Sequence, residues 1–418
     1  MKVLVVGGGA AGVAAAAAAS ASGADVTLLE GSDTPGPNRA LFPCVLSGEC
    51  PPERLRADAS SLLRSGVELR FNERVQSVDP SSHVRTGSGR FDFDSLVIAT
   101  GSRHLDVETK GTSKPGVFLL RSLDDYVALS RSMAGLSHVA VAGSVPLSLM
   151  VAQILSQGSK VRAFIGQSGL RRFSPGVRGA IARAAAANGV ELLNADVGAV
   201  VGTGRVEAVV SSGRVYPCDG VVILPRGTPA LPQTVCRMGN HGGLLVDRWM
   251  RTSSKNVFAA GDCAELRLGP ASVPCRLYSS ARMMGDVAGI NAAGGAVQAR
   301  LAGCLAMRLF GVEVCAAGIE AEEGARIGLD TVRVDSEVVD DLSGANPVYA
   351  SVVYDRSTRR VHGIQVAGAG ALSLSEYASL VVALGVSLEE LAYHESPYLP
   401  GFNRDRCPIA LTAGKALA

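Results

Sequence analysis

A glycine-rich turn close to the N-terminus is the feature that most constrains how this chain folds. Residues 2–6 form an apolar run typical of buried parallel strands, and Gly7-x-Gly9-x-x-Gly12 follows directly. An alanine-rich stretch then continues to about Ser22. The order predicts a strand, a tight turn and a helix. The stretch is also apolar enough for a signal peptide, but its early glycines and the lack of a cleavage-like stop favour the strand–turn–helix.

The residue types in this turn indicate what it can bind. The first glycine permits the turn, the second lets the backbone approach a pyrophosphate, and the third lets the helix pack on the sheet. Residues 25–30 predict the next parallel strand, which ends in Glu30, 18 residues beyond Gly12. A carboxylate at that place can accept hydrogen bonds from a ribose. These features predict an α/β dinucleotide-binding unit; the alternative is a glycine-rich packing turn.

Composition excludes several other classes of protein. The 418 residues predict two or three domains at roughly 150 residues each. Hydrophobic residues make up 47% and charged residues 19%, which excludes a disordered chain. A net charge of +2 does not indicate nucleic-acid or membrane-surface binding, and no run predicts a membrane span. Nine scattered cysteines without zinc spacing predict no metal site and a reducing, cytoplasmic setting.

The strand–helix–strand pattern occurs twice in the first 300 residues. Further strands are predicted at 91–100, 137–143, 160–165, 219–224 and 256–260. We predict two Rossmann-like nucleotide-binding domains, the second inserted in the first, because the second pattern interrupts the first. After residue 303, alternating strands at 348–354 and 361–366 and a helix at 372–384 predict an α+β domain. The predicted domains are 1–112 with 242–302, 113–241, and 303–418.

A second motif lies at residues 256–265, where a predicted strand ends in Gly261 and Asp262. A helix is predicted at 273–293. Asp262 at the end of a strand could hold a ribityl hydroxyl, and its combination with the glycine turn favours FAD over NAD at the first site. The alternative is an ordinary helix N-cap.

Cys44 is the candidate redox thiol. Pro43 before it suits the first turn of a helix, whose positive end would lower the pKa of the thiol and favour thiolate. Cys50 follows six residues later, about 9 Å along a straight helix. A disulfide needs α-carbons within about 7 Å, so a Cys44–Cys50 pair requires the helix to break at Ser47 and Gly48. The alternative for any single cysteine is a small buried apolar residue.

These motifs, in this order, resemble the FAD-dependent pyridine nucleotide–disulfide oxidoreductases. They are GGGAAG at 7–12, Glu30, FPC at 42–44, IATG at 98–101 and AGDCAE at 260–265. The single-cysteine branch, with coenzyme A-disulfide reductases, NADH oxidases and NADH peroxidases, fits best. The resemblance implies an FAD site that comprises Gly7, Gly9, Ala10, Ala11, Gly12, Glu30, Ala99, Thr100, Gly101, Gly261 and Asp262.

The same resemblance implies roles for the cysteine and for the C-terminal domain. Cys44 would be the redox cysteine beside the flavin, and residues 303–418 would form the dimerisation domain of a homodimer. Tyr398, in a Tyr-Leu-Pro-Gly-Phe segment, would reach the partner subunit's cysteine. His394 could serve as a general base only if its segment folds close to that cysteine; a lone histidine is more often solvated.

Three departures from the family pattern narrow the function. Ala10 stands where the oxidases and peroxidases carry a histidine, which argues against reduction of oxygen or peroxide by a His–Cys pair. The late part of the first helix, 16–22, lacks the basic residues that meet coenzyme A, which argues against CoA disulfide. A smaller sulfur compound, a persulfide or polysulfide, or a protein dithiol is an equally open candidate for the substrate.

The third departure concerns the nicotinamide site. Gly143-Ser-Val145-Pro146-Leu-Ser148 stands where a second glycine triplet is expected, and only its first glycine is present. Val145 places a branched side chain where backbone should approach phosphate, and Pro146 removes an amide donor. The next strand ends without an acidic residue, and Arg162 is the only local arginine. These features argue against NAD(P)H binding in the usual mode.

The sequence therefore predicts an FAD-dependent disulfide or sulfur oxidoreductase that works through Cys44 on a small sulfur-containing substrate or CoA derivative. A second hypothesis is an FAD-binding electron-transfer subunit, reduced by a protein partner or thiol rather than by NAD(P)H. A third is a catalytically inactive flavin-binding protein.

Overall fold

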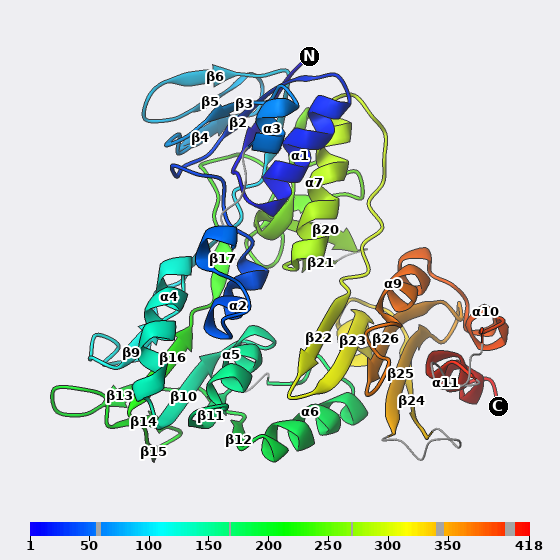
Figure 1. Cartoon of the computed structure of the whole chain (residues 1–418). Coiled ribbons are helices and arrows are strands. Elements are labelled where there is room, and N and C mark those ends of the chain that lie inside the picture. The colour runs from blue at the N-terminus through cyan, green and yellow to red at the C-terminus, as the bar shows by residue number, and fades with distance from the viewer. Residues whose placement is uncertain (56–59, 167–168, 269–270, 340–346, 398–405) are drawn as a thin grey trace. The chain divides into compact units, whose positions relative to one another are not determined.

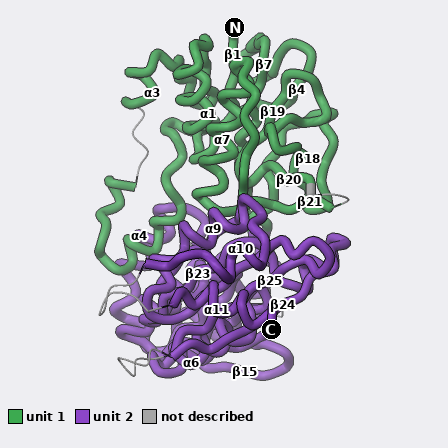
Figure 2. The backbone as a smooth tube through the Cα atoms, turned by 90° about the vertical axis from the view of Figure 1, so that its right-hand side faces the viewer, with its two compact units in different colours: residues 1–105, 227–301 green, residues 106–226, 302–418 purple. Residues whose placement is uncertain are grey.

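The computed structural model describes residues 1–55, 60–166, 169–268, 271–339, 347–397 and 406–418. The chain forms two compact units (Figure 2): residues 1–105 with 227–301, and residues 106–226 with 302–418. Each unit is therefore built from two separate stretches of sequence. The division into three domains stays a prediction.

The first unit contains the parallel sheet that the glycine turn predicts. Its strands lie in the order β19 (Val257–Ala259), β7 (Ser95–Ile98), β1 (Lys2–Val6), β2 (Asp25–Leu29), β3 (Glu68–Arg70). Helices α1 (Ala10–Ala21) and α7 (Tyr278–Ala292) lie side by side (Figure 1). Small residues permit this approach, because a Cβ on Gly285 would lie only 2.9 Å from that of Ala14. The strands predicted at 2–6, 25–30 and 256–260 are confirmed.

Two expectations for the first unit were wrong. The strand expected at 91–100 is divided between β6 (Arg90–Asp92) and β7, because Asp94 turns away to accept a hydrogen bond from the Lys2 amide at 2.7 Å. The helix expected from residue 273 begins only at Tyr278. Before it, β20 (Ala264–Leu268) and β21 (Ala271–Pro274) form an antiparallel pair.

The smaller elements of the first unit complete it. They are α2 (Phe42–Leu46), α3 (Ser60–Arg64), β4 (Ser77–Asp79), β5 (His83–Arg85), β8 (Ser102–His104), β17 (Gly227–Pro229) and β18 (Leu244–Val246). Buried Glu265 on β20 fixes the loop before β18: it accepts hydrogen bonds from the amides of His241, at 3.0 Å, and Gly243, at 2.6 Å.

The second unit begins with the second parallel sheet, as predicted. The order is β12 (Val190–Leu193), β11 (Lys160–Phe164), β10 (His138–Gly143), β16 (Gly220–Leu224), β9 (Val117–Leu119). Its helices are α4 (Leu123–Ser132), α5 (Leu147–Leu155) and α6 (Pro175–Ala187). A three-stranded antiparallel sheet accompanies it, formed by β13 (Ala199–Val201), β14 (Ala208–Ser211) and β15 (Arg214–Pro217).

The C-terminal stretch folds as the predicted α+β structure. Its antiparallel sheet runs β22 (Leu305–Leu309), β23 (Val312–Gly318), β26 (Val361–Ala367), β25 (Val348–Asp355), β24 (Thr331–Val338). The helices are α8 (Ala321–Arg326), α9 (Ser375–Leu384), α10 (Leu388–Tyr393) and α11 (Pro408–Lys415). None of the helices in the described ranges combines the length and apolar character needed to cross a bilayer.

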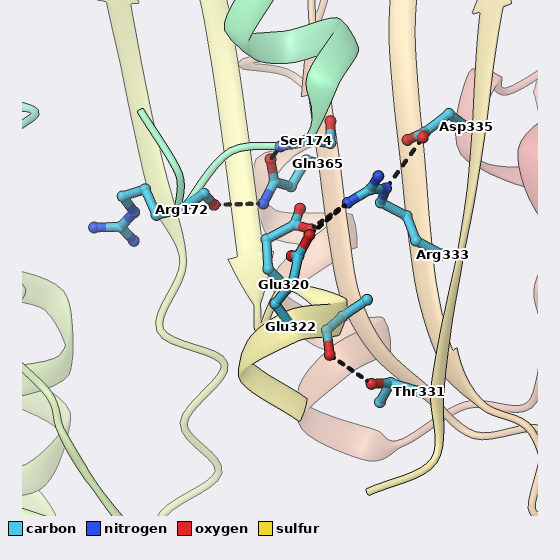
Figure 3. Close-up of polar contacts among 9 residues, drawn as sticks. Arg172, Ser174, Glu320, Glu322, Thr331, Arg333, Asp335 and Gln365 are labelled. Carbon is cyan, nitrogen blue, oxygen red and sulfur yellow. Dashed lines mark hydrogen bonds and ion pairs between the residues drawn. The ribbon is translucent and has the colours of Figure 1, made fainter. Parts of the chain in front are cut away.

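Buried polar contacts join the two stretches of the second unit (Figure 3). The Gln365 amide oxygen on β26 accepts from the Ser174 amide at 2.8 Å, and its nitrogen donates to the Arg172 carbonyl at 2.9 Å. Nearby, Arg333 on β24 forms ion pairs with Glu320 and Asp335, each at 3.1 Å. The buried amide bridge explains why residues 106–226 and 302–418 belong to one unit.

Candidate cofactor and thiol site

The glycine turn lies between β1 and α1, and its glycines meet different surroundings. Gly7 has φ +103, and a Cβ there would overlap the Ala99 carbonyl. A Cβ on Gly12 would overlap the Gly7 carbonyl oxygen and lie 2.9 Å from its carbon. A Cβ on Gly9, in contrast, would meet nothing within 4 Å. Gly9 thus faces open space at the N-terminus of α1, where a pyrophosphate would fit.

Glu30, the residue after β2, lies against this turn. One carboxylate oxygen accepts from the Gly8 amide at 2.6 Å. The other accepts from the amide and hydroxyl of Ser32, at 2.9 and 2.7 Å. The acidic group is therefore held at the place where a ribose of a bound dinucleotide would lie. The supporting role of Ser32 could not be inferred from the sequence, because it depends on how the chain turns after β2.

The segment 99–101 lies at the end of β7, beside β1. The Ala99 amide donates to the Val6 carbonyl at 2.8 Å, and the Thr100 hydroxyl donates to the Ala230 carbonyl. Gly101 has φ +68, which favours glycine. The ends of neighbouring parallel strands thus bring Ala99 against Gly7 of the glycine turn, while the role of this segment in cofactor binding stays a prediction.

Gly261 and Asp262 follow β19, next to β7. A Cβ on Gly261 would lie 2.9 Å from that of Ala11, so this backbone packs closely on α1. Asp262 accepts a hydrogen bond from the Ser102 hydroxyl at 3.0 Å. It lies in a short 3-10 turn followed by β20, so the alternative of an N-cap of the helix expected at 273–293 is wrong.

Cys44 occupies α2, and its thiol is half-buried. Burial raises the pKa of this thiol above its usual value, and negative charge on Glu49 and Cys50 raises it further. The expectation that the helix end lowers this pKa was wrong. The helix has five residues, so its dipole is small, and a carboxylate lies close by.

The helix ends before Cys50, as the pairing of the two cysteines requires. Ser47 caps α2, and Gly48 follows with φ +74. The Cys50 amide then donates to the Cys44 carbonyl at 3.2 Å. The backbone of Cys50 is thus hydrogen-bonded to the backbone of Cys44, six residues earlier in the chain.

A cavity of about 450 Å³ lies along the outer side of α1. It runs from Ala10 to Ala17, and Leu41, directly before α2, also lines it. Arg54 and Arg282 line it as well, together with Asp286, whose carboxyl group interacts with the charge of Arg282. Sequence reasoning missed both arginines, because they come from segments more than 200 residues apart.

His394 and Tyr398 are the remaining candidates from the sequence. His394 ends α10; its Nδ1 lies 2.9 Å from the Leu391 carbonyl oxygen, and its Nε2 lies 3.1 Å from the Tyr377 hydroxyl. Tyr398 lies outside the described residues. Their action on a partner subunit stays a prediction.

In the segment where the family pattern places a nicotinamide nucleotide, side chains are buried or already bonded to other protein groups. Pro146 is the N-cap of α5, and Ser148 on its first turn is fully buried. Arg162 forms an ion pair with Glu191 at 2.9 Å and donates to the Pro217 carbonyl at 3.1 Å. This arginine is therefore engaged within the sheet rather than presented to a phosphate.

Comparison with known proteins agrees with this architecture. Residues 1–285 match the family described as pyridine nucleotide-disulphide oxidoreductase. The chain is 26% identical over 398 residues, 90% of each protein, to a CoA-dependent NAD(P)H sulfur oxidoreductase of Pyrococcus furiosus. Its fold is similar to that of an NAD-dependent persulfide reductase from A. fulgidus, with a TM-score of 0.88 and 22% identity, over 100% of this chain and 83% of that one. The fold is also similar to that of a FAD-dependent pyridine nucleotide-disulphide oxidoreductase from Desulfovibrio vulgaris, with a TM-score of 0.71 and 21% identity over the whole of both chains.

Proposed function

Because the chain belongs to the pyridine nucleotide-disulphide oxidoreductase family, we propose that it reduces a disulfide, persulfide or polysulfide through Cys44, with FAD as its cofactor. The chain is an oxidoreductase of that family, and the family implies FAD. The observation that carries the sulfur chemistry is the position of Cys44: its thiol is half-buried on helix α2, three residues after Leu41, which lines the cavity along α1.

The residues of the glycine turn fit a flavin dinucleotide. Gly9 leaves open the space that a pyrophosphate would fill, and Glu30 offers a carboxylate to a ribose. Gly101 and Asp262, at the ends of the neighbouring strands, would contact the rest of the cofactor. When bound, the flavin would supply two electrons to a disulfide.

Cys44 would act as the nucleophile. Its thiolate attacks one sulfur of the substrate, a mixed disulfide or persulfide forms on Cys44, and the other sulfur leaves as a thiolate. Two electrons, which bound reduced flavin would supply, then break the sulfur–sulfur bond, so that Cys44 returns to the thiolate and the remaining fragment leaves as a thiolate or as hydrosulfide. The raised pKa of Cys44 means that only a minor fraction of the free protein carries the thiolate at neutral pH.

The cavity supports an anionic substrate. Arg54 and Arg282 supply two positive charges against the one carboxyl group of Asp286, and the late part of α1 itself has no charge. The Pyrococcus relative is named for its dependence on CoA. A CoA derivative is therefore a substrate candidate beside smaller persulfides. The family resemblance of the C-terminal stretch supports a homodimer in which Tyr398 of each chain serves the other.

A visible spectrum of the purified protein tests this proposal. A yellow protein that develops a long-wavelength charge-transfer band on partial reduction supports a thiolate beside the flavin. Cys44→Ser should remove the band and the turnover of a persulfide or disulfide. A colourless protein, or a band that persists in Cys44→Ser, would contradict the proposal.

A second function is favoured by the surroundings of α5. Val145 and buried Ser148 replace the two later glycines expected for NAD(P)H, and Pro146 removes an amide donor, which supports an electron-transfer subunit that a protein partner or thiol reduces. The relatives named for NAD(P)H argue the other way. Anaerobic stopped-flow mixing with NADH and NADPH decides between the two, because rapid bleaching of the flavin would exclude the second function.

A further inference from the structure

Two further cysteines lie together in the C-terminal sheet of the second unit. Strands β22 and β23 form an antiparallel hairpin in which Ala306 lies opposite Cys315. Cys304 directly precedes β22, and the Gly318 amide donates to the Ala302 carbonyl at 2.6 Å, so the two segments stay side by side beyond this cysteine. Because side chains alternate between the faces of a sheet, Cys304 shares the face of Ala306 and therefore that of Cys315. The two cysteines are diagonal neighbours across the hairpin.

A hydrogen bond joins the two thiols. This bond lowers the pKa of the Cys304 thiol, and the same bond, together with burial, raises the pKa of the Cys315 thiol. Cys304 is therefore the thiol of the pair that ionises first. Diagonal neighbours have Cβ atoms somewhat less than about 7–8 Å apart, and a disulfide needs about 3.5–4.5 Å. Because β22 is an edge strand, the chain before it has room to move this distance.

The two thiols differ in their access to solvent. Cys315 is fully buried in the hydrophobic core of the C-terminal sheet, where α9 packs on β23. Cys304 is half-buried at the border of that core, and its thiol donates to the Ser375 carbonyl, at the start of α9, at 3.5 Å. A partly accessible thiol with a lowered pKa reacts with a reagent from solvent, whereas a buried thiol with a raised pKa does not. Cys304 can therefore react first, and Cys315 can only follow it.

We propose that Cys304 and Cys315 form an oxidisable dithiol, which a small disulfide or polysulfide converts into a disulfide between the ends of β22 and β23. Cys304 thiolate attacks a disulfide RS–SR′, forms Cys304–S–S–R and releases R′S⁻. The Cys315 thiol gives its proton to R′S⁻ and attacks the Cys304 sulfur, so that the Cys304–Cys315 disulfide forms and RS⁻ leaves. The pair loses two electrons, which reduce RS–SR′ to two thiols. The reaction also removes the hydrogen that Cys304 donates to Ser375, and it requires neither flavin nor Cys44.

Tryptic peptides make this cross-link visible. Cleavage after arginine leaves Cys304 in peptide 301–308 and Cys315 in peptide 309–326, each without another cysteine. Reduced holoenzyme is incubated with glutathione disulfide, quenched in acid, denatured, alkylated and digested. The two peptides should appear joined, with a mass two hydrogens below the sum of their reduced forms. Treatment with an excess of a small thiol should separate them again.

Single substitutions test the order of the two steps. Cys315→Ala should leave glutathione on Cys304, because no neighbouring thiol displaces it. Cys304→Ala should slow the modification of Cys315 at least about tenfold, because the buried thiol loses its reactive partner. Cys407→Ala, the matched control, changes another half-buried cysteine that packs against the same core and should form the cross-link as wild type does.

The outcomes separate this inference from the proposed function. Peptides 301–308 and 309–326 that stay separate in the wild-type protein would overturn the inference, and so would glutathione on Cys315 in Cys304→Ala at the wild-type rate. Cys44→Ser should form the cross-link normally although it loses turnover. A cross-link that disappears in Cys44→Ser would also overturn the inference, because the oxidation would then pass through Cys44.

Discussion

Two substitutions in the glycine turn should separate cofactor binding from folding. Gly9→Ala adds a Cβ that points into open space, whereas Gly12→Ala adds one 2.9 Å from the Gly7 carbonyl carbon. The two glycines lie three residues apart in one turn and receive the same methyl group. Any difference in outcome therefore reports what each Cβ meets.

The expected magnitudes follow from these surroundings. At Gly9, φ is −75, so alanine fits the backbone, and its effect on the free energy of unfolding should stay within about 0.5 kcal/mol. A Cβ in the space for the pyrophosphate should weaken FAD binding by about 1–3 kcal/mol, roughly fivefold to 150-fold. At Gly12, α1 must move away from β1, which should cost about 3 kcal/mol of stability and roughly 10 °C in Tm.

FAD content and thermal unfolding measure the two effects separately. Gly9→Ala should purify with little flavin, keep the Tm of the wild-type apoprotein, and gain stability only at high added FAD. Gly12→Ala should unfold earlier with or without FAD. If Gly9→Ala binds FAD as tightly as wild type, the open space at Gly9 does not face the cofactor, and the reasoning for the whole site is refuted.

Three further predictions concern single carboxylates. Glu30→Gln removes an ionised acceptor and should weaken FAD binding roughly tenfold, measured by flavin fluorescence; unchanged affinity would exclude a ribose contact. The alkylation rate of Cys44, measured on the tryptic peptide 40–54, should rise with pH, and Glu49→Gln should lower the pKa of this thiol and increase its alkylation rate at pH 7. Equal rates in Glu49→Gln and wild type would exclude the influence of Glu49. Hydrogen bonds from Ser357 and Thr358 lower the pKa of Asp355 from 3.8 to about 2. Its stabilising contribution is therefore present above about pH 4 and lost as pH falls towards 2, and Asp355→Asn should flatten this part of an acid unfolding curve.

The sequence predicted the parallel sheets because their signals are local. Each central strand, such as 2–6 or 219–224, is an apolar run bounded by turn residues, and the helix after the glycine turn has no internal breaker. The pair formed by β20 and β21 was missed although residues 264–268 alternate between apolar and polar, because β21 has only four residues and lies close before the helical pattern of α7. The sequence could not predict that Arg54 and Arg282 line one cavity, because the segment around Arg54 and helix α7 lie more than 200 residues apart and meet only in the folded chain.

The pKa of the Cys44 thiol shows how burial and neighbouring charge can outweigh the effect of a helix N-terminus. Pro43 did predict a helix start, and α2 includes both residues. The helix dipole acts over one short turn, however, while burial and the charge of Glu49 act on the same thiol in the opposite direction. The break at Gly48 has a second effect, because it also brings Cys50 close. The sequence showed that a Cys44–Cys50 pair requires the helix to break at Ser47 and Gly48, but it did not show that the helix breaks there.

The second parallel sheet can persist whether or not its unit binds a nicotinamide nucleotide. Gly143 ends β10 where a Cβ would lie 2.7 Å from that of Leu224, so strand packing alone accounts for this glycine. The buried bridge from Gln365 to Ser174 ties the same stretch to the C-terminal sheet at 2.8 Å. These contacts stabilise the fold without any phosphate, so an intact sheet and a degenerate fingerprint are compatible. The rate of flavin reduction by NADH and NADPH, and not the presence of the fold, therefore decides which electron donor this protein uses.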